Sequence, residues 1–99
     1  MAANCYRTGV KAAAGDYRYF WVDVPAGTTE LKITVAGGTG NADLYYNPAT
    51  WATTTAHTQS SVKTTNAETL TITNPEPGYR YFSLHAASAF DKVKVTTVF

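Results

Sequence analysis

The sequence predicts an all-β protein, an antiparallel β-sandwich with a jelly-roll-like arrangement of strands. Two observations carry this prediction. Apolar and polar residues alternate along most of the chain, whereas the three-and-four spacing of an amphipathic helix is nearly absent. Valine, threonine and aromatic residues fill the alternating runs, and clusters of proline and glycine separate those runs at short intervals. Short strands at this spacing, without helices, form sandwiches or jelly rolls.

The alternating runs define six strands. They are expected at residues 17–24, 30–35, 43–46, 68–73, 79–86 and 92–99. The first strand ends at Pro25-Ala26-Gly27, because proline removes a ladder donor and glycine supplies turn freedom. The second stops at Gly37–Asn41, which we interpret as a hairpin connection. The polar stretch between Ala49 and Asn66 is expected to be a long loop with room for one short strand, and 74–78 is a turn.

Length and charge exclude several classes of protein. A chain of 99 residues with a net charge of +1 is one domain, expected to comprise an N-terminal arm over residues 1–14 and a sandwich over residues 15–99. No apolar run approaches the roughly 18 residues of a membrane span. The lysines are scattered, so we expect no nucleic-acid partner and no membrane partner. Cys5 is the single cysteine, which excludes an intrachain disulfide and leaves its role open.

Side-chain alternation predicts an unusual outer face. In the strands over 17–24 and 79–86, the residues expected to fill the interior are Phe20, Val22, Val24, Phe82 and Leu84. The intervening residues must point the other way. The large rings among them are Tyr17, Tyr19, Trp21, Tyr79 and Tyr81. So many rings depart from the usual polar outer face of an antiparallel sheet, and exposed aromatic clusters generally mark binding surfaces.

These rings have two interpretations. The C–H bonds of a sugar can stack on aromatic faces, and rings at positions i and i+2 of one strand lie roughly 6.5–7 Å apart, from a rise of about 3.3 Å per residue. Tyr17, Tyr19 and Trp21 would then form a strip that holds two or three sugar units or an extended protein segment. Alternatively, the rings stabilise the sheet by cross-strand pairing. Trp51 is either a lid over a sheet edge or a solvent-facing platform.

Candidate metal ligands are few. Asn41 and Asp43, with backbone carbonyls of the glycine stretch, could offer oxygens to Ca²⁺, although such residues also commonly bond the local backbone. No cofactor is required, and calcium is the one that the sequence could accommodate. His57 and His85 lack the spacing of a transition-metal site.

Nothing in the sequence predicts an enzyme. Ser60 and Ser61 lie outside a G-x-S-x-G elbow, and the carboxylates mostly lie at strand ends and turns. The run Gly37-Gly38-Thr39-Gly40 has neither the following Lys-Ser/Thr nor the helix of a phosphate loop.

Three motifs follow one another in a characteristic order. Val24-Pro25-Ala26-Gly27 is followed by Leu31-x-Ile33-x-Val35 and then by Gly37-Gly38-Thr39-Gly40-Asn41-Ala42-Asp43-Leu44-Tyr45. Later come Pro77-Gly78-Tyr79-Arg80-Tyr81-Phe82-Ser83-Leu84 and the terminal Val93-x-Val95. This order resembles the bacterial pre-peptidase C-terminal domain, whose pattern is approximately VPAG, L.V, GG.GDADLYV and PG.YY..V. The resemblance extends from Gly15 to Phe99.

The resemblance implies a β-sandwich carried after the catalytic domain of secreted bacterial peptidases, chitinases and other polymer-degrading enzymes. It also implies a removable, secretion-linked appendage, with related domains that bind insoluble collagen or polysaccharide. The sequence departs from the family pattern in two places. Asn41 stands where the first aspartate is usual, which bears on any calcium site, and the frequent cysteine pair after Asp43-Leu44-Tyr45 is missing.

The residues and the resemblance together predict a non-catalytic accessory module of a secreted hydrolase. Its expected partners are the parent catalytic domain and an insoluble polymer, with polysaccharide such as chitin or cellulose first and collagen second. The proposed ligand-binding residues are Tyr17, Tyr19, Trp21, Trp51, Tyr79 and Tyr81. A processing or secretion appendage that binds no ligand is one alternative, and a structural spacer is another.

Overall fold

The structure, a computed structural model, describes residue 1, residues 3–64 and residues 66–99. Within this part of the chain there are seven strands and no helix, which confirms the all-β class. The strands are β1 (Cys5–Ala12), β2 (Tyr17–Val24), β3 (Glu30–Ala36), β4 (Thr39–Asn47), β5 (Gln59–Ser61), β6 (Glu68–Thr73) and β7 (Gly78–Val98). In the described residues no segment forms a helix that could cross a membrane.

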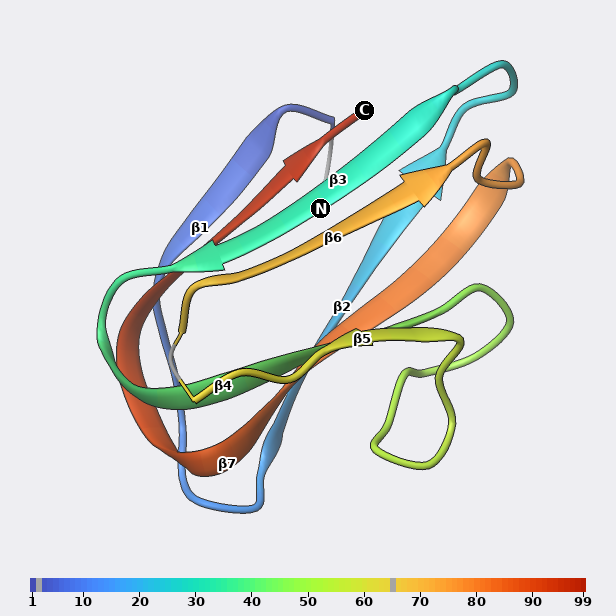
Figure 1. Ribbon diagram of the computed structural model, residues 1–99. Coiled ribbons are helices and arrows are strands. Elements are labelled where there is room, and N and C mark those ends of the chain that lie inside the picture. Colours follow the sequence, from blue (N-terminus) through green and yellow to red (C-terminus); the bar gives the residue numbers. More distant parts are fainter. Residues whose placement is uncertain (2, 65) are drawn as a thin grey trace.

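The strands form two antiparallel layers that share β7 (Figure 1). One layer has the order β1, C-terminal half of β7, β3, β6. The other has the order β2, N-terminal half of β7, β4, β5. The edge strands of the two layers approach each other, β1 beside β2 and β5 beside β6, so that the sandwich is nearly closed into a barrel.

β7 is one continuous strand where the sequence suggested two. The expected strands 79–86 and 92–99 are joined through residues 87–91, so β7 leaves one layer and enters the other. The pairing of β7 with β4 shifts register around Asn41, and Lys92 has a φ of 57°. Such bulges bend a strand and increase its twist, which lets one strand turn the corner between two packed sheets.

Two further stretches are more regular than the sequence suggested. Residues 5–12, assigned to the N-terminal arm, form β1 and pair with β7. The sequence did not predict this strand, because its apolar residues do not alternate. Its register with β7 shifts on both sides of Val10. β4 begins at Thr39, inside the stretch expected to be a connection. The strands expected at 17–24 and 68–73 have the predicted bounds, and the short strand expected within 49–66 is β5.

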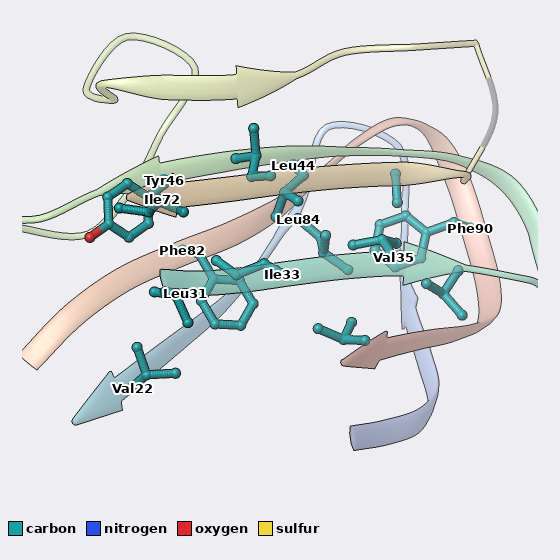
Figure 2. Packing of buried hydrophobic residues seen from close by; sticks show 14 of the residues in the cluster. Val22, Leu31, Ile33, Val35, Leu44, Tyr46, Ile72, Phe82, Leu84 and Phe90 are labelled. Atoms are coloured by element: carbon teal, nitrogen blue, oxygen red, sulfur yellow. The ribbon is translucent and has the colours of Figure 1, made fainter. Parts of the chain in front are cut away.

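The core lies between the two layers (Figure 2). Alternate residues of each strand supply it, as the alternation predicted for β3, β6 and β7. Its fully buried aliphatic and aromatic members include Val22, Val24, Leu31, Ile33, Val35, Leu44, Phe82, Leu84, Val93 and Val95. Phe20, predicted to be interior, is only partly buried and stacks on Phe82 with ring centroids 5.0 Å apart.

The glycine stretch lets β4 press against the corner of β7. Gly40 has a φ of +86°, and a Cβ built on it would lie 1.9 Å from the carbonyl oxygen of Ala89. Gly38 has a φ of +69°, and its Cβ would lie 2.1 Å from the carbonyl oxygen of Asp91. Both the left-handed backbone and the missing side chain are therefore required where the two strands bend together.

Buried polar groups fasten the segment between β5 and β6. Glu68, fully buried, accepts hydrogen bonds from the Ser61 hydroxyl and from the backbone N–H of Lys63, the latter at 2.8 Å. Asn66 accepts from the N–H of Ala42 at 2.7 Å and donates to two carbonyls of the glycine stretch. These bonds satisfy groups whose burial would otherwise be costly.

Asp43 carries a buried carboxyl group whose hydrogen bonding is incomplete. Its Oδ1 atom has no hydrogen-bond partner. Burial raises the pKa of Asp43, the nearby Glu68 carboxyl raises it further, and His85, opposite it on β7, acts in the other direction. The ionised form of this side chain is therefore disfavoured in the folded protein.

Substituting Gly40→Ala should destabilise the fold strongly. Gly15→Ala is a matched control, because Gly15 has a similar φ of +84° but open space where the Cβ would be. We expect the left-handed backbone to lower the free energy of unfolding of both variants by roughly 1–2 kcal/mol. The clash should lower that of Gly40→Ala by about 1–3 kcal/mol more. Urea unfolding measures the difference, and equal losses in the two variants would show that β4 does not need this close approach.

Substituting Asp43→Asn should stabilise the protein at neutral pH. A carboxyl whose pKa is higher in the folded than in the unfolded state reduces stability once it ionises, and this cost disappears as pH falls through the folded pKa. The neutral variant should therefore unfold at a higher urea concentration than the native chain at pH 7, with the gap closing in acid. Asp23→Asn, at an exposed site, is the control. A variant that is less stable at pH 7 would contradict this reading.

Candidate functional site

The outer face of the β2–β7–β4 layer carries the predicted rings. Register places Tyr17 beside His85, Tyr19 beside Ser83, Trp21 beside Tyr81 and Asp23 beside Tyr79. β4 continues these rows on the other side of β7 with Asp43, Tyr45 and Asn47. The predicted orientation is confirmed, because Tyr19, Trp21 and Tyr79 are 48%, 46% and 57% exposed while their neighbours on β2 and β7 fill the core.

One group of rings forms a continuous chain of contacts. Tyr17 and Tyr19 stack on each other with centroids 5.3 Å apart and planes 11° apart. Trp51 contacts Tyr19 at 5.5 Å and Tyr81 at 4.9 Å. Trp51 thus packs over the sheet and is still 46% exposed, which combines the two interpretations offered for it.

Trp21 and Tyr79 form a second group beside the first. Their rings meet edge to face at 5.2 Å and 87°. Together with Trp51 and Tyr81 they line an open groove of about 230 Å³. Four aromatic side chains from two strands and one loop thus converge on one concave surface.

The loop over residues 48–58 folds back across the sheet and carries Trp51 with it. Ser83, fully buried on β7, donates from its hydroxyl to the carbonyl oxygen of Ala52 at 2.7 Å. The Tyr17 hydroxyl accepts from the N–H of Thr54 at 3.1 Å and donates to its hydroxyl at the same distance. The loop is therefore bonded to both β7 and β2 directly after Trp51.

Further contacts hold the two ends of this loop. Arg80 donates to the carbonyl oxygen of Pro48 at 3.2 Å, and the Asn47 side chain donates to the carbonyl oxygen of Ala56 at 3.1 Å. His57 packs against Tyr45 with centroids 4.8 Å apart. Tyr45 is consequently buried, which raises the pKa of its hydroxyl.

Asn47, Ser83 and Tyr45 are not among the ligand-binding residues predicted from the sequence. Alternation along β4, with Leu44 inward, would have placed Tyr45 on the outer face. That Ser83 is a loop anchor could not be found in this way, because its partner lies 31 residues away and is a backbone carbonyl.

Asn41 and Asp43 lie at the far end of β4, away from the groove. Each has an Oδ1 atom that is buried and lacks a hydrogen-bond partner, which is a feature expected of an oxygen that binds a cation. Ca²⁺ takes six to eight oxygens, however, and in the described residues no three His, Cys, Asp or Glu side chains gather into a metal-binding group. The two side chains fit a calcium site only in part, and their role as ligands stays a prediction.

Comparison with known proteins identifies the family to which this sequence is related. Residues 16–86 match the model of the family described as the bacterial pre-peptidase C-terminal domain. The chain is 42% identical over 86 residues to an extracellular protease of Xanthomonas campestris, with 87% of the chain and 15% of that protein covered. It is 33% identical over 90 residues to a microbial collagenase of Vibrio parahaemolyticus, with 83% and 11% covered. An alkaline serine exoprotease A of Vibrio alginolyticus is 30% identical over 88 residues, with 89% and 16% covered.

The chain therefore spans only about one tenth to one sixth of the length of these relatives. The matched segment runs from the start of β2 into the middle of β7 and includes more than half of the chain. On this evidence the chain belongs to the bacterial pre-peptidase C-terminal domain family.

Proposed function

We propose that this domain is a non-catalytic accessory module of a secreted peptidase and that it docks an extended polypeptide substrate, such as collagen, in its aromatic groove. The observation that carries the proposal is the convergence of Trp21, Trp51, Tyr79 and Tyr81 on one open surface. Relatives that include a microbial collagenase and an extracellular protease support a peptidase as the parent and secretion as its route.

Groove shape and composition favour an extended polypeptide. Grooves lined by tryptophan and tyrosine bind polyproline II segments, which are already extended and lose little entropy on binding. Trp and Tyr also dominate the energetics of interfaces, since each combines a large apolar surface with a polar group. Side chains of proline-rich strands would insert between the edge-to-face pair of Trp21 and Tyr79 and the ring of Trp51.

Polysaccharide is the second candidate. The observation that favours it is the row of rings on β2, Tyr17 and Tyr19 followed by Trp21. Sugars bind to free ring faces, however, and Tyr17 and Tyr19 turn their faces toward each other at 5.3 Å. We therefore place chitin and cellulose after collagen, in reverse of the order that the sequence suggested.

Alanine at Trp21 or at Tyr79 should abolish retention on insoluble collagen. Removing one ring from the groove should weaken binding by about 2 kcal/mol, roughly 30-fold, as for other aromatic residues at the centre of an interface. The measurement is co-sedimentation of the 99-residue chain with collagen, chitin and cellulose in parallel.

Tyr6→Ala is the matched control for this experiment. Tyr6 is 62% exposed and lies on β1 in the other layer, under the ammonium group of Lys94. Its loss should leave retention unchanged. Retention on chitin or cellulose alone would favour the polysaccharide function. If the native chain is retained on none of the three, an appendage for processing or secretion becomes the better description.

Ser83→Ala should weaken the same binding without touching the groove directly. The substitution removes the hydrogen bond to Ala52 and leaves that carbonyl buried without a partner, at a cost of about 1–3 kcal/mol. The loop carrying Trp51 should then be cleaved faster by added protease and collagen affinity should fall. Ser60→Ala, at an exposed position on β5, is the control. Unchanged cleavage of the loop would show that Ser83 does not anchor it.

A further inference from the structure

The seam between β1 and β2 is a side of the sandwich that no pairing between the described strands closes. The two strands are consecutive, lie at the edges of opposite layers and diverge from the turn at residues 13–16 (Figure 1). In the described residues each of them pairs with β7 alone. Each strand therefore presents one edge toward the other across the seam, with no strand between them.

A groove of about 450 Å³ occupies the seam, lined by residues 7–11 of β1 and 18–20 of β2. This volume is within the roughly 300–1,000 Å³ of typical ligand sites. Its apolar part comes from Val10 and Phe20, which are partly buried and packed against the core. Phe20 points inward and is nevertheless accessible, because the layers separate at this point.

The backbone of β2 offers hydrogen bonds to this groove. The carbonyl oxygen of Trp21 accepts from the amino group of Met1, and that of Tyr17 accepts from the Arg18 side chain at 3.2 Å. Both carbonyls therefore point away from β7. Because backbone groups alternate along a strand, the N–H and C=O of Tyr19, between them, point the same way. The N–H and C=O of Tyr19 are the groups to which another strand can add.

The charge of the groove is one-sided. Arg7, Lys11 and Arg18 line it, and no described acidic residue does. In the part of the chain that the structure describes, the one ion pair joins Arg80 to Glu76, at the other end of β2. Three cations without carboxylate partners, around an apolar floor, are complementary to a segment that alternates acidic and apolar side chains.

We propose that an extended acidic segment of a partner polypeptide binds in this seam as an added β-strand along β2. Its backbone pairs with the N–H and C=O of Tyr19, its apolar side chains cover Val10 and Phe20, and its carboxylates meet Arg7, Lys11 and Arg18. Strand addition gives affinity through the main chain and specificity through alternate side chains. This site is distinct from the aromatic groove, to which β2 contributes side chains and not its edge.

β2 is the partner strand because β1 is unsuitable. The pairing of β1 with β7 shifts register between Arg7 and Val10, and Gly9 within this bulge has a φ of 66°. A bulge bends an edge strand and so hinders its pairing with another strand. β2 pairs with β7 without interruption from Tyr17 to Val24 and so keeps a straight edge. β1 contributes its cations instead.

The test uses a six-residue peptide of alternating glutamate and valine, with blocked ends, titrated into the 99-residue chain by calorimetry. We expect saturable binding that weakens with salt. A version methylated on alternate backbone nitrogens should bind at least about tenfold more weakly, because it cannot form the ladder. A lysine–valine peptide should not bind.

Charge-reversed variants complete the design. Arg7→Glu with Arg18→Glu should lose the glutamate–valine peptide and acquire the lysine–valine peptide. Lys32→Glu with Lys94→Glu changes the net charge equally at two exposed cations outside the groove, and this variant should bind like the native chain. Circular dichroism and thermal unfolding confirm that each variant is folded.

Three results would overturn the proposal. The first is no binding of the glutamate–valine peptide at millimolar concentration, and the second is equal binding of the methylated peptide. The third is self-association of the native chain that Arg7→Glu with Arg18→Glu abolishes, since this would assign the seam to a second copy. None of these results bears on retention by collagen, so the two proposals fail separately.

Discussion

The fold depends on one strand that belongs to both layers. β7 pairs with β2 and β4 in its first half and with β1 and β3 in its second, so its alternation of inward and outward side chains sets the alternation of its neighbours. Phe82 and Leu84 face the core in one layer, and Val93 and Val95 face it in the other. Tyr79 and Tyr81 are consequently driven to the outer surface.

The passage of β7 through both layers explains the glycines at the corner and the aromatic side chains on the outer face. A strand that turns from one layer to the other needs a neighbour that follows it closely, and Gly38 and Gly40 allow β4 to do so. The tyrosine and tryptophan rings lie together on the outer face, because the interior is already filled by aliphatic side chains and phenylalanine. Trp51 completes the groove only because Ser83 and Tyr17 bond its loop to the sheet.

The two proposed surfaces use different parts of β2. Its outward side chains, Tyr19 and Trp21, belong to the aromatic face, whereas its backbone edge faces the seam beside β1. The first surface is apolar and nearly uncharged, so it suits a proline-rich or sugar polymer. The second is cationic with an apolar floor, so it suits an acidic strand. One short domain can therefore hold a substrate on its face and a partner polypeptide at its edge.

The sequence by itself determined the class of fold, the bounds of β2 and β6, and the faces on which Phe82, Tyr19 and Trp21 lie. These follow from a period of two residues, which is local information. Only the tertiary structure decided that β7 is continuous, that residues 5–12 form a strand, that Ser83 anchors Trp51, and that the seam beside Arg7 and Arg18 stays open. Each of these depends on partners far away along the chain, because strand pairing and loop docking are fixed by contacts between distant segments that no local pattern records.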